Sequence, residues 1–309
     1  MGTFTLTGSV IRRLFALNSF AIPDDRAVLF GLRGSLPLNE KEYDLTSSRQ
    51  VETVMPDHRH PRCTIGVWLP QSDQFAAYPG STLPYYKSVE KAISAEGEGC
   101  NQLVPSYLKF ERGMHPRSNA KAQHEAFRQA MDFPVQRTGD DAVYELDDRW
   151  EVDSEMGDNI HCGESQGSHQ PYFSSFGCQV LCGTAKRTKK PNSVDTGAWK
   201  AFREIAYGDG QQQLFRYALL TGRQAQAAAI EPAGSMSRMV RYGSTGTLVG
   251  KVQDALASSG YGTATQRGNF GRGTLFAVRR FQKDRGLPPD AVVGPDTGAL
   301  LQFTDWPRS

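Results

Sequence analysis

The C-terminal stretch of residues 241–301 carries the most constraining pattern in this 309-residue chain, because its apolar positions repeat with helical spacing. Val249, Val252 and Leu256 stand at i, i+3 and i+7, which places them on one face of a helix. Glycines between the apolar runs end helices or permit tight turns. The pattern predicts a small bundle of helices with its own core.

Two threonines mark the expected starts of the next two helices. Thr274 and Thr297 each precede an apolar run and can act as N-caps. The segment resembles the type 1 peptidoglycan-binding domain, a three-helix module, over nearly its whole length. The matching positions include Gly246, Val249, Val252, Gln253, Leu256, Gly260, Asn269, Phe270, Gly271, Phe281, Gln282, Asp290, Val293 and Gly294. The resemblance implies peptidoglycan, both stem peptides and glycan, as the partner.

A second pattern joins a histidine to a cysteine. His161 stands 17 positions before Cys178, and Gly177 directly precedes the cysteine. A thiol becomes a useful nucleophile when a nearby imidazole accepts its proton. A glycine beside it lets backbone N–H groups approach the reacting carbonyl as an oxyanion hole. All six histidines precede Cys178, whereas papain-like peptidases place the cysteine first.

This spacing resembles the catalytic signature of the L,D-transpeptidases, in which a histidine and a spacer precede Ser/Thr-His-Gly-Cys. The resemblance implies that Cys178 is the nucleophile and His161 its base. It also implies that the backbone N–H groups of Phe176, Gly177 and Cys178 itself stabilise the oxyanion. We expect neither a cofactor nor a metal. The candidates for orienting the loop or binding substrate are Ser174, Ser175, Asn159 and Gln179.

The sequence departs from the family pattern on both sides of the cysteine. Phe176 replaces the usual histidine two positions before Cys178. The arginine that usually follows and helps to hold the donor peptide is missing, and Gln179, Val180 and Leu181 stand there instead. The sequence therefore leaves open whether an amine or water accepts the acyl group, which separates L,D-transpeptidase or exchange activity from L,D-carboxypeptidase activity.

The fold class predicted is α+β, with a mainly β, L,D-transpeptidase-like catalytic domain and a small three-helix domain. We expect a strand and loop region of the catalytic domain at residues 1–50, and the rest of that domain at 51–220. A linker rich in Ala, Gln and Gly follows at 221–238, and the peptidoglycan-binding domain occupies 239–305.

Local patterns predict several elements inside the catalytic region. We expect a strand at 28–32, two strands within 64–77 around a turn at 70–73, a hairpin bordering the cleft within 101–115, a helix at 119–131 and helical structure over 199–220.

Composition limits the partners. Charged residues make up 22% of the chain and the formal net charge is +2, so neither a nucleic-acid-binding face nor a polybasic membrane anchor is indicated. No apolar run approaches the roughly 20 residues that span a bilayer, so stable membrane insertion is not expected. The N-terminus shows no clear signal peptide. A wall substrate nevertheless implies action in the periplasm or cell wall, by an export route that the sequence leaves open.

The remaining cysteines allow other interpretations. Cys63, Cys100, Cys162 and Cys182 could form two disulfides or stay as free thiols. His161, His169, Cys162, Cys178 and Cys182 could together supply zinc ligands. No tightly spaced ligand pair supports zinc, and adjacent His161 and Cys162 are not expected to reach one ion.

The sequence therefore supports a peptidoglycan-modifying cysteine enzyme as the main hypothesis. A second hypothesis is a wall-binding protein with a degenerate catalytic domain. A third is the same enzyme delivered as an antibacterial toxin or phage-type lysin, which would imply an immunity or export partner.

Overall fold

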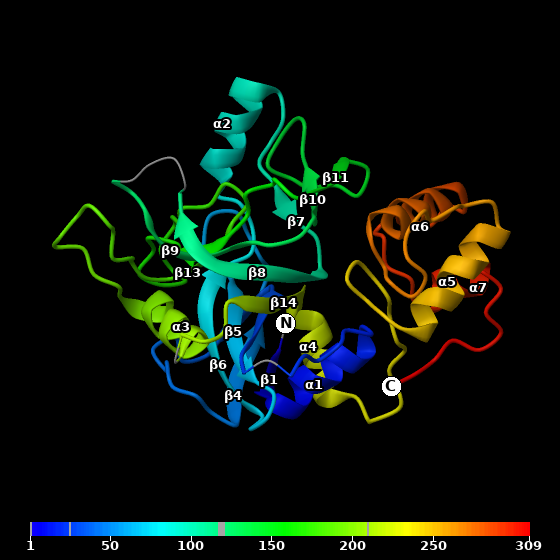
Figure 1. The fold of residues 1–309 in the computed structure, drawn as a ribbon, viewed down its shortest axis with the longest axis horizontal. Coiled ribbons are helices and arrows are strands. Elements are labelled where there is room, and N and C mark those ends of the chain that lie inside the picture. Colours follow the sequence, from blue (N-terminus) through cyan, green and yellow to red (C-terminus); the bar gives the residue numbers. More distant parts are fainter. Residues whose placement is uncertain (1, 25, 117–120, 209) are drawn as a thin grey trace.

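The computed structural model describes residues 2–24, 26–116, 121–208 and 210–309. A closed eight-stranded barrel forms its body, with strand order β12-β13-β6-β5-β2-β14-β8-β9, and a helical C-terminal module lies beside it (Figure 1). The barrel strands are β2 (Val28–Arg33), β5 (Cys63–Leu69), β6 (Gln74–Ser81), β8 (Ser106–His115), β9 (His124–Gln129), β12 (Ile160–Cys162), β13 (Gln179–Leu181) and β14 (Leu214–Thr221). This agrees with a mixed α+β chain.

Two small sheets accompany the barrel. One has the order β1-β4-β3, from β1 (Thr3–Thr7), β4 (Ser48–Thr53) and β3 (Ser35–Pro37). The other has the order β11-β10-β7, from β11 (Arg149–Asp153), β10 (Phe133–Arg137) and β7 (Gln102–Leu103). The helices are α1 (Gly8–Leu17), α2 (Tyr86–Glu96), α3 (Gly197–Tyr207), α4 (Gly222–Ile230), α5 (Thr247–Ser258), α6 (Arg272–Asp284) and α7 (Pro295–Leu300).

Strand β2 shows why the barrel strands contain continuous apolar runs. Its successive side chains point to opposite faces, and both faces are buried. Leu29 joins the large core that also contains Phe127 and Trp199, whereas Val28 and Phe30 join a second core beneath α1 and α4. The strand predicted at 28–32 and the two strands predicted around residues 70–73 are confirmed.

The N-terminal region contains a helix that the sequence analysis missed. Thr7 caps α1, because its side chain accepts a hydrogen bond from the N–H of Val10 at 3.2 Å. Arg12 and Arg13 interrupt the apolar run, but neither lies in the core. Arg12 pairs with Asp73 at 2.7 Å, and Arg13 donates to carbonyls at the end of α4.

The stretch expected to be a linker, 221–238, begins with a packed helix. Ala225 and Ala228 of α4 are buried in the second core, and α4 contacts both β1 and α1. Small alanine side chains permit this close approach, although the same composition is typical of a flexible linker. The first part of the stretch therefore belongs with the barrel.

Two helix predictions were wrong in part. Residues 124–129, inside the helix predicted at 119–131, form strand β9, and residues 119 and 120 lie outside the described residues. The helical pattern over 199–220 splits into α3 and strand β14. Strand β14 is buried on both sides over most of its length, and periodicity alone does not separate such a run from a buried helix.

The C-terminal module contains the three expected helices, but their caps differ. Gly271 and Gly294 occupy the N-cap positions of α6 and α7. Thr274 and Thr297 lie inside these helices and accept hydrogen bonds from buried glutamines, Thr274 from Gln253 at 2.9 Å and Thr297 from Gln282 at 3.3 Å. The threonines therefore join the helices to one another instead of capping them.

Hydrogen bonds join the module to the barrel domain. The N–H of Tyr107 donates to the carbonyl of Tyr242 at 3.0 Å, and the Tyr242 hydroxyl donates to the carbonyl of Asp132 at 2.9 Å. Ser244 donates to the carbonyl of Asn18 at 2.6 Å. One buried apolar cluster continues from barrel to module, so the two parts share a core.

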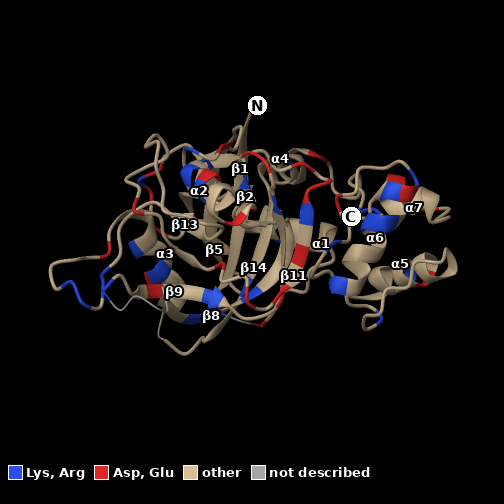
Figure 2. Ribbon diagram, turned by 90° about the horizontal axis from the view of Figure 1, so that it is seen from above, with Lys and Arg blue, Asp and Glu red and all other residues tan. Residues whose placement is uncertain are grey.

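The distribution of charged and apolar residues in the structure agrees with the low net charge of the chain. Basic and acidic residues are interspersed along the ribbon (Figure 2). No helix within the described ranges has the length and apolar character required to cross a membrane.

Phe127 connects the core to the site. Its ring is fully buried among Phe202, Tyr207 and Phe215, and its backbone pairs with Ile160 of β12. We expect Phe127→Ala to lower the free energy of unfolding by about 3–5 kcal/mol, because it leaves a cavity. Chemical denaturation would measure this. Val143→Ala, at a position 55% exposed, should change it by less than about 0.5 kcal/mol.

Candidate active site

The pairing of β12 with β13 brings the predicted histidine and cysteine together. The two strands are parallel, with Ile160 opposite Gln179 and His161 opposite Val180. Cys178 directly precedes β13, so its side chain lies beside the start of β12. A ligand nitrogen of His161 and the sulfur of Cys178 lie within 4.8 Å of each other. Most of the 16 residues between His161 and Cys178 form the loop that connects these two neighbouring parallel strands.

His161 is buried and its ring is held by its own backbone. Its Nδ1 donates to the carbonyl of Cys162 at 2.7 Å, which assigns the proton to Nδ1 and leaves Nε2 as the acceptor. Burial, followed by the neighbouring His115 and His124, holds the pKa of His161 well below its usual value. The imidazole is therefore neutral at pH 7 and can accept a proton.

Cys178 is a neutral thiol in this geometry. Burial, followed by the charge of Asp158, raises its pKa to about 12. Its sulfur accepts a hydrogen bond from the N–H of Asn159 at 3.4 Å and lies 3.9 Å from the carbonyl oxygen of Gly157. The pair is thus an imidazole and a thiol, not a preformed imidazolium and thiolate.

The loop before Cys178 is fixed from within. Gly177 has φ +136°, and a Cβ there would lie 2.5 Å from an oxygen of Asp158, so only glycine fits. The hydroxyl of Ser175 accepts from the N–H of Gly177 at 3.2 Å and donates to the carbonyl of Cys178 at 2.8 Å. Gln179 is fully buried and donates to the carbonyl of Gly177 at 3.2 Å.

These contacts change two of the sequence-based expectations. The N–H of Gly177 is engaged by Ser175 and does not face a substrate oxygen. The N–H of Phe176 donates to no backbone carbonyl of the described residues, whereas the N–H of Cys178 interacts with its own sulfur. The burial of Gln179 excludes direct substrate contact from that side chain. The N–H of Ser174 donates to the carbonyl of Gly163 at 2.7 Å.

His115 belongs to the same cluster, although the sequence analysis assigned it no role. Its ring stacks on that of His161, with centroids 4.3 Å apart. The side-chain amide of Asn159 donates to its Nδ1 at 2.9 Å and to the carbonyl of Gly157 at 2.8 Å. Burial, followed by His124, lowers the pKa of His115 to about 4. The hairpin expected within 101–115 is not formed, because β7 pairs with β10 while β8 pairs with β9 and β14.

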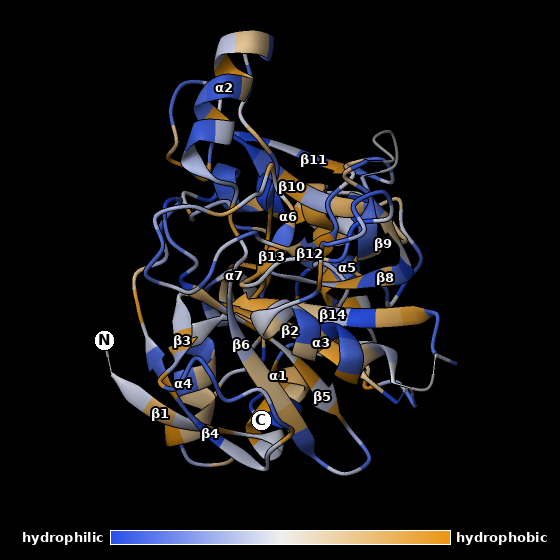
Figure 3. Cartoon of the chain, turned by 90° about the vertical axis from the view of Figure 1, so that its left-hand side faces the viewer, coloured by the Kyte–Doolittle hydropathy of each residue, from blue (hydrophilic) through white to orange (hydrophobic). Residues whose placement is uncertain are grey.

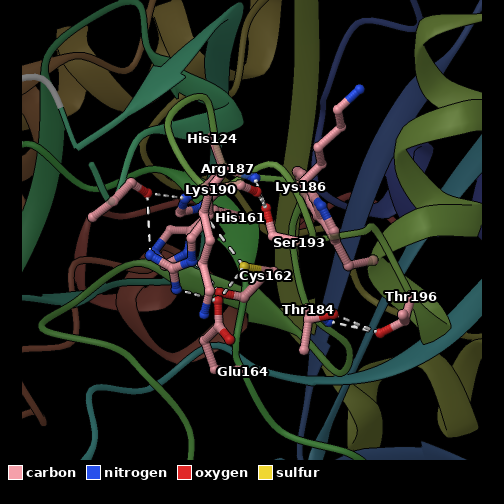
Figure 4. A network of polar contacts seen from close by, with 12 residues as sticks. His124, His161, Cys162, Glu164, Thr184, Lys186, Arg187, Lys190, Ser193 and Thr196 are labelled. Carbon is pink, nitrogen blue, oxygen red and sulfur yellow. Dashed lines mark hydrogen bonds and ion pairs between the residues drawn. The ribbon is translucent and has the colours of Figure 1, made fainter. Parts of the chain in front are cut away.

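A second thiol, that of Cys162, lies close to His161 and His124 (Figure 4). The sulfur of Cys162 is 3.7 Å from Nε2 of His124 and 3.3 Å from an oxygen of Glu164. Arg187 pairs with the same oxygen at 2.7 Å. Burial, followed by the charge of Glu164, raises the pKa of Cys162 well above its usual value, so this thiol is also neutral.

Two groups within the described part of the chain have the ligand types that zinc prefers. One contains His115, His161 and Cys178; the other contains His124, His161 and Cys162. The expectation that His161 and Cys162 could not reach one ion was therefore wrong. His169 and Cys182, which were also considered as zinc ligands, lie in neither group.

All five cysteines are free and buried, including Cys63, Cys100 and Cys182. The structure therefore corresponds to the free-thiol alternative and not to the two-disulfide one.

A cavity of about 300 Å³ lies beside the Cys178 loop. Helix α2, which projects from the barrel (Figure 3), supplies one wall through Lys91 and Glu96. Asn101, Arg137 and the 58%-exposed ring of Phe176 complete the lining.

The geometry thus defines a chain with a buried Cys–His pair on a β-barrel and a helical C-terminal module. Residues 245–301 match the peptidoglycan-binding domain family, so a type 1 peptidoglycan-binding domain forms the C-terminal part of the protein. This domain indicates an association with the cell wall.

Two sequence relatives match part of the chain. Two spore cortex-lytic enzymes of Bacillus cereus are 35% identical to this chain over 65 residues, which cover 21% of the chain and 25% of each relative. The match thus spans about a quarter of the relatives' length. No solved structure matches the chain significantly.

Asp158 provides a test of the thiol's electrostatics. Its pKa is raised to about 7, mainly by burial, so it is charged above pH 7 and neutral below. We expect Asp158→Asn to lower the pKa of Cys178 and to increase the rate at which iodoacetamide labels Cys178 at pH 9. Below pH 7 the difference should vanish, because Asp158 is protonated there.

Mass spectrometry of the Cys178 peptide would follow this labelling over pH. Asp153→Asn, which removes an exposed carboxylate, is the control and should label as the wild type does. Equal rates for Asp158→Asn and the wild type at pH 9 would contradict the electrostatic role of Asp158.

Proposed function

We propose that this protein is a peptidoglycan-modifying cysteine enzyme acting on stem peptides. The observation that carries the proposal is the Cys178–His161 pair, aligned by parallel strands and with the His161 tautomer fixed by the Cys162 carbonyl. The peptidoglycan-binding domain supports the substrate class. The relatives' name, spore cortex-lytic enzyme, supports a wall-degrading activity. The substrate places this activity in the periplasm or cell wall.

The first half of the reaction forms an acyl-enzyme. The sulfur of Cys178 attacks the carbonyl carbon at the L-centre of the diamino acid in position three, while Nε2 of His161 takes the thiol proton. The N–H groups of Phe176 and Cys178 stabilise the oxyanion. The bond to the terminal D-amino acid then breaks, its nitrogen receives the proton from His161, and a thioester remains on Cys178.

The second half depends on the acceptor. An amine gives a new amide, as in L,D-transpeptidase or exchange activity, and water gives a shortened stem, as in L,D-carboxypeptidase activity. In either reaction His161 removes a proton from the acceptor and returns it to the sulfur. Asn159 positions the neighbouring His115, and Ser175 and Gln179 position the loop.

The high pKa of Cys178 favours a mechanism in which proton transfer and attack by the sulfur are concerted. A thiol with a pKa of about 12 is almost wholly protonated at pH 7, so removal of the base should strongly reduce turnover. His161→Gln preserves size and hydrogen bonding but not the base. It should lower turnover at pH 7 by at least about a hundredfold, and raising the pH should restore part of it.

Replacement of the nucleophile is the direct test. Cys178→Ala should reduce turnover of purified tetrapeptide muropeptides by at least about a thousandfold, because no acyl-enzyme can form. Mass spectrometry would detect loss or exchange of the terminal D-Ala, or a new cross-link between residues at position three. Binding to isolated walls should persist in the variant, since the C-terminal domain is unchanged.

Cys182→Ala is a matched control, because Cys182 is also a buried free thiol. Turnover by Cys178→Ala comparable to that of Cys182→Ala would refute the assignment. No turnover by the wild type, with wall binding retained, would instead favour the wall-binding protein with a degenerate site. Lysis only after periplasmic expression would identify the toxin or lysin, for which an immunity or export partner is then expected.

The His124–His161–Cys162 group favours one second candidate, a zinc-dependent wall hydrolase. Metal removal separates the two. For the cysteine enzyme, a chelator should leave turnover unchanged and iodoacetamide should abolish it. Turnover that is lost with the chelator and restored by zinc would establish the metal enzyme.

A further inference from the structure

A second, larger cavity lies at the junction between the barrel domain and the C-terminal module. Its volume is about 550 Å³, within the range of roughly 300–1,000 Å³ typical of small-molecule sites, which often occur between domains. Residues from both parts line it, including Arg33 and Trp150 from the barrel domain and Thr297 from the module.

A buried cation is the main chemical feature of this cavity. Arg241 is 4% exposed and forms no ion pair with the residues that the structure describes. Its Nη2 contacts only the sulfur of Met239, at 3.3 Å, and its buried Nε has no hydrogen-bond partner there. Asp290 also lines the cavity and attracts Arg241 at longer range, but it is exposed to solvent. A buried arginine without a carboxylate is costly unless an anion compensates it.

Other polar groups around the cavity are also unpaired. The indole Nε1 of Trp150 and the side-chain oxygen of Gln224 are both buried without a hydrogen-bond partner among the described residues. Arg33 is bonded to the carbonyls of Thr82 and Leu103 and pairs with no described carboxylate, so it adds a second positive charge. The lining also includes Asp290 and Asp296, so the cavity has no net excess of positive charge. What distinguishes it is that buried donors of Arg241 and Trp150 have no hydrogen-bond partner among the described residues.

The small sheet β11-β10-β7 separates this cavity from the one at Cys178. Gln102, Gln136 and Trp150 stand opposite one another across its three strands, and all three line the junction cavity. The adjacent Arg137 points to the opposite face and lines the cavity beside Phe176. One sheet thus presents side chains to both cavities.

Contacts across the junction keep this arrangement in place. The guanidinium of Arg279, on α6, lies 3.9 Å from the ring centroid of Trp150 and donates to the carbonyl of Leu146 at 2.9 Å. The module therefore forms one wall of the cavity and also covers part of the indole.

We propose that the junction cavity binds a carboxylate of peptidoglycan, held by the guanidinium of Arg241 with the indole N–H of Trp150 beside it. The ligand class rests on the peptidoglycan-binding domain and the proposed function, whereas the site itself rests on the unpaired groups. The carboxylate comes either from a muramic acid that carries no stem peptide or from a stem peptide, and both present the same planar anion.

The test uses the full chain carrying Cys178→Ala, so that no probe is consumed. N-acetylmuramic acid, N-acetylglucosamine and a stem tetrapeptide would be titrated separately, with calorimetry and Trp150 indole shifts as readouts. We expect the first or the third probe to bind and N-acetylglucosamine, which lacks a carboxylate, not to bind. The probe that binds identifies the source of the anion. Failure of both carboxylate probes up to about 10 mM would overturn the proposal.

Variants then locate the site. Adding Arg241→Met should weaken binding at least about tenfold, because a charge-assisted hydrogen bond is lost. The same change should leave the melting temperature unchanged or raise it, since a methionine fills the space without an unpaired charge. A purely structural arginine would instead lower the melting temperature. Arg267→Met, at an exposed arginine of the module, is the matched control and should bind as the parent does.

Trp150→Phe gives a second test that retains the aromatic ring facing Arg279. It should weaken binding about threefold to tenfold through loss of one N–H. Unchanged affinity in both Arg241→Met and Trp150→Phe would place the ligand elsewhere and refute the site. If Arg241→Met does not fold, the ligand affinities of Arg241→Lys and Trp150→Phe decide whether the ligand binds in this cavity. Turnover in the Cys178-containing chain is measured separately, so failure of the cavity and failure of the Cys178 reaction are distinguishable.

Discussion

The parallel pairing of β12 with β13 is the interaction on which the candidate site depends. Only three residues of each strand pair, yet this register sets His161 beside Cys178 and holds Asn159 against the sulfur. The pairing is itself supported by barrel closure, because β12 contacts β9 and β13 contacts β6. A short parallel pair is stable here since the barrel core covers it. The chemistry of the loop therefore depends on the packing of the whole barrel.

Burial explains the electrostatics of the site. The imidazoles of His115, His124 and His161 lie close to the thiols of Cys162 and Cys178. Each of these groups is held in its neutral form. Neutral partners avoid the cost of buried charge and leave the proton on sulfur until a substrate arrives. The same principle makes Arg241 exceptional, because it is charged and buried without a described carboxylate. The two cavities are thus chemically distinct, and the small sheet β11-β10-β7 lies between them.

The sequence alone was most informative where a pattern is local. The apolar spacing of Val249, Val252 and Leu256 predicted the first module helix, and the run at residues 28–32 predicted β2. Prediction failed where both faces of an element are buried. Strand β14 has no polar side to give it a two-residue period, and α4 hides a packed helix in a composition typical of a linker. Helix α1 was missed because its arginines pair with groups distant in sequence.

The sequence by itself determined the wall-binding module and the Cys178–His161 pattern, because both are written in ordered spacings along the chain. Tertiary structure alone decided the rest of the site. His115, His124 and Cys162 surround His161 because a hairpin places the two histidines opposite each other and closure brings that hairpin against β12. Likewise, the cavity around Arg241 exists only because the module packs on the barrel. Such groups are distant in sequence, so no spacing records that they meet.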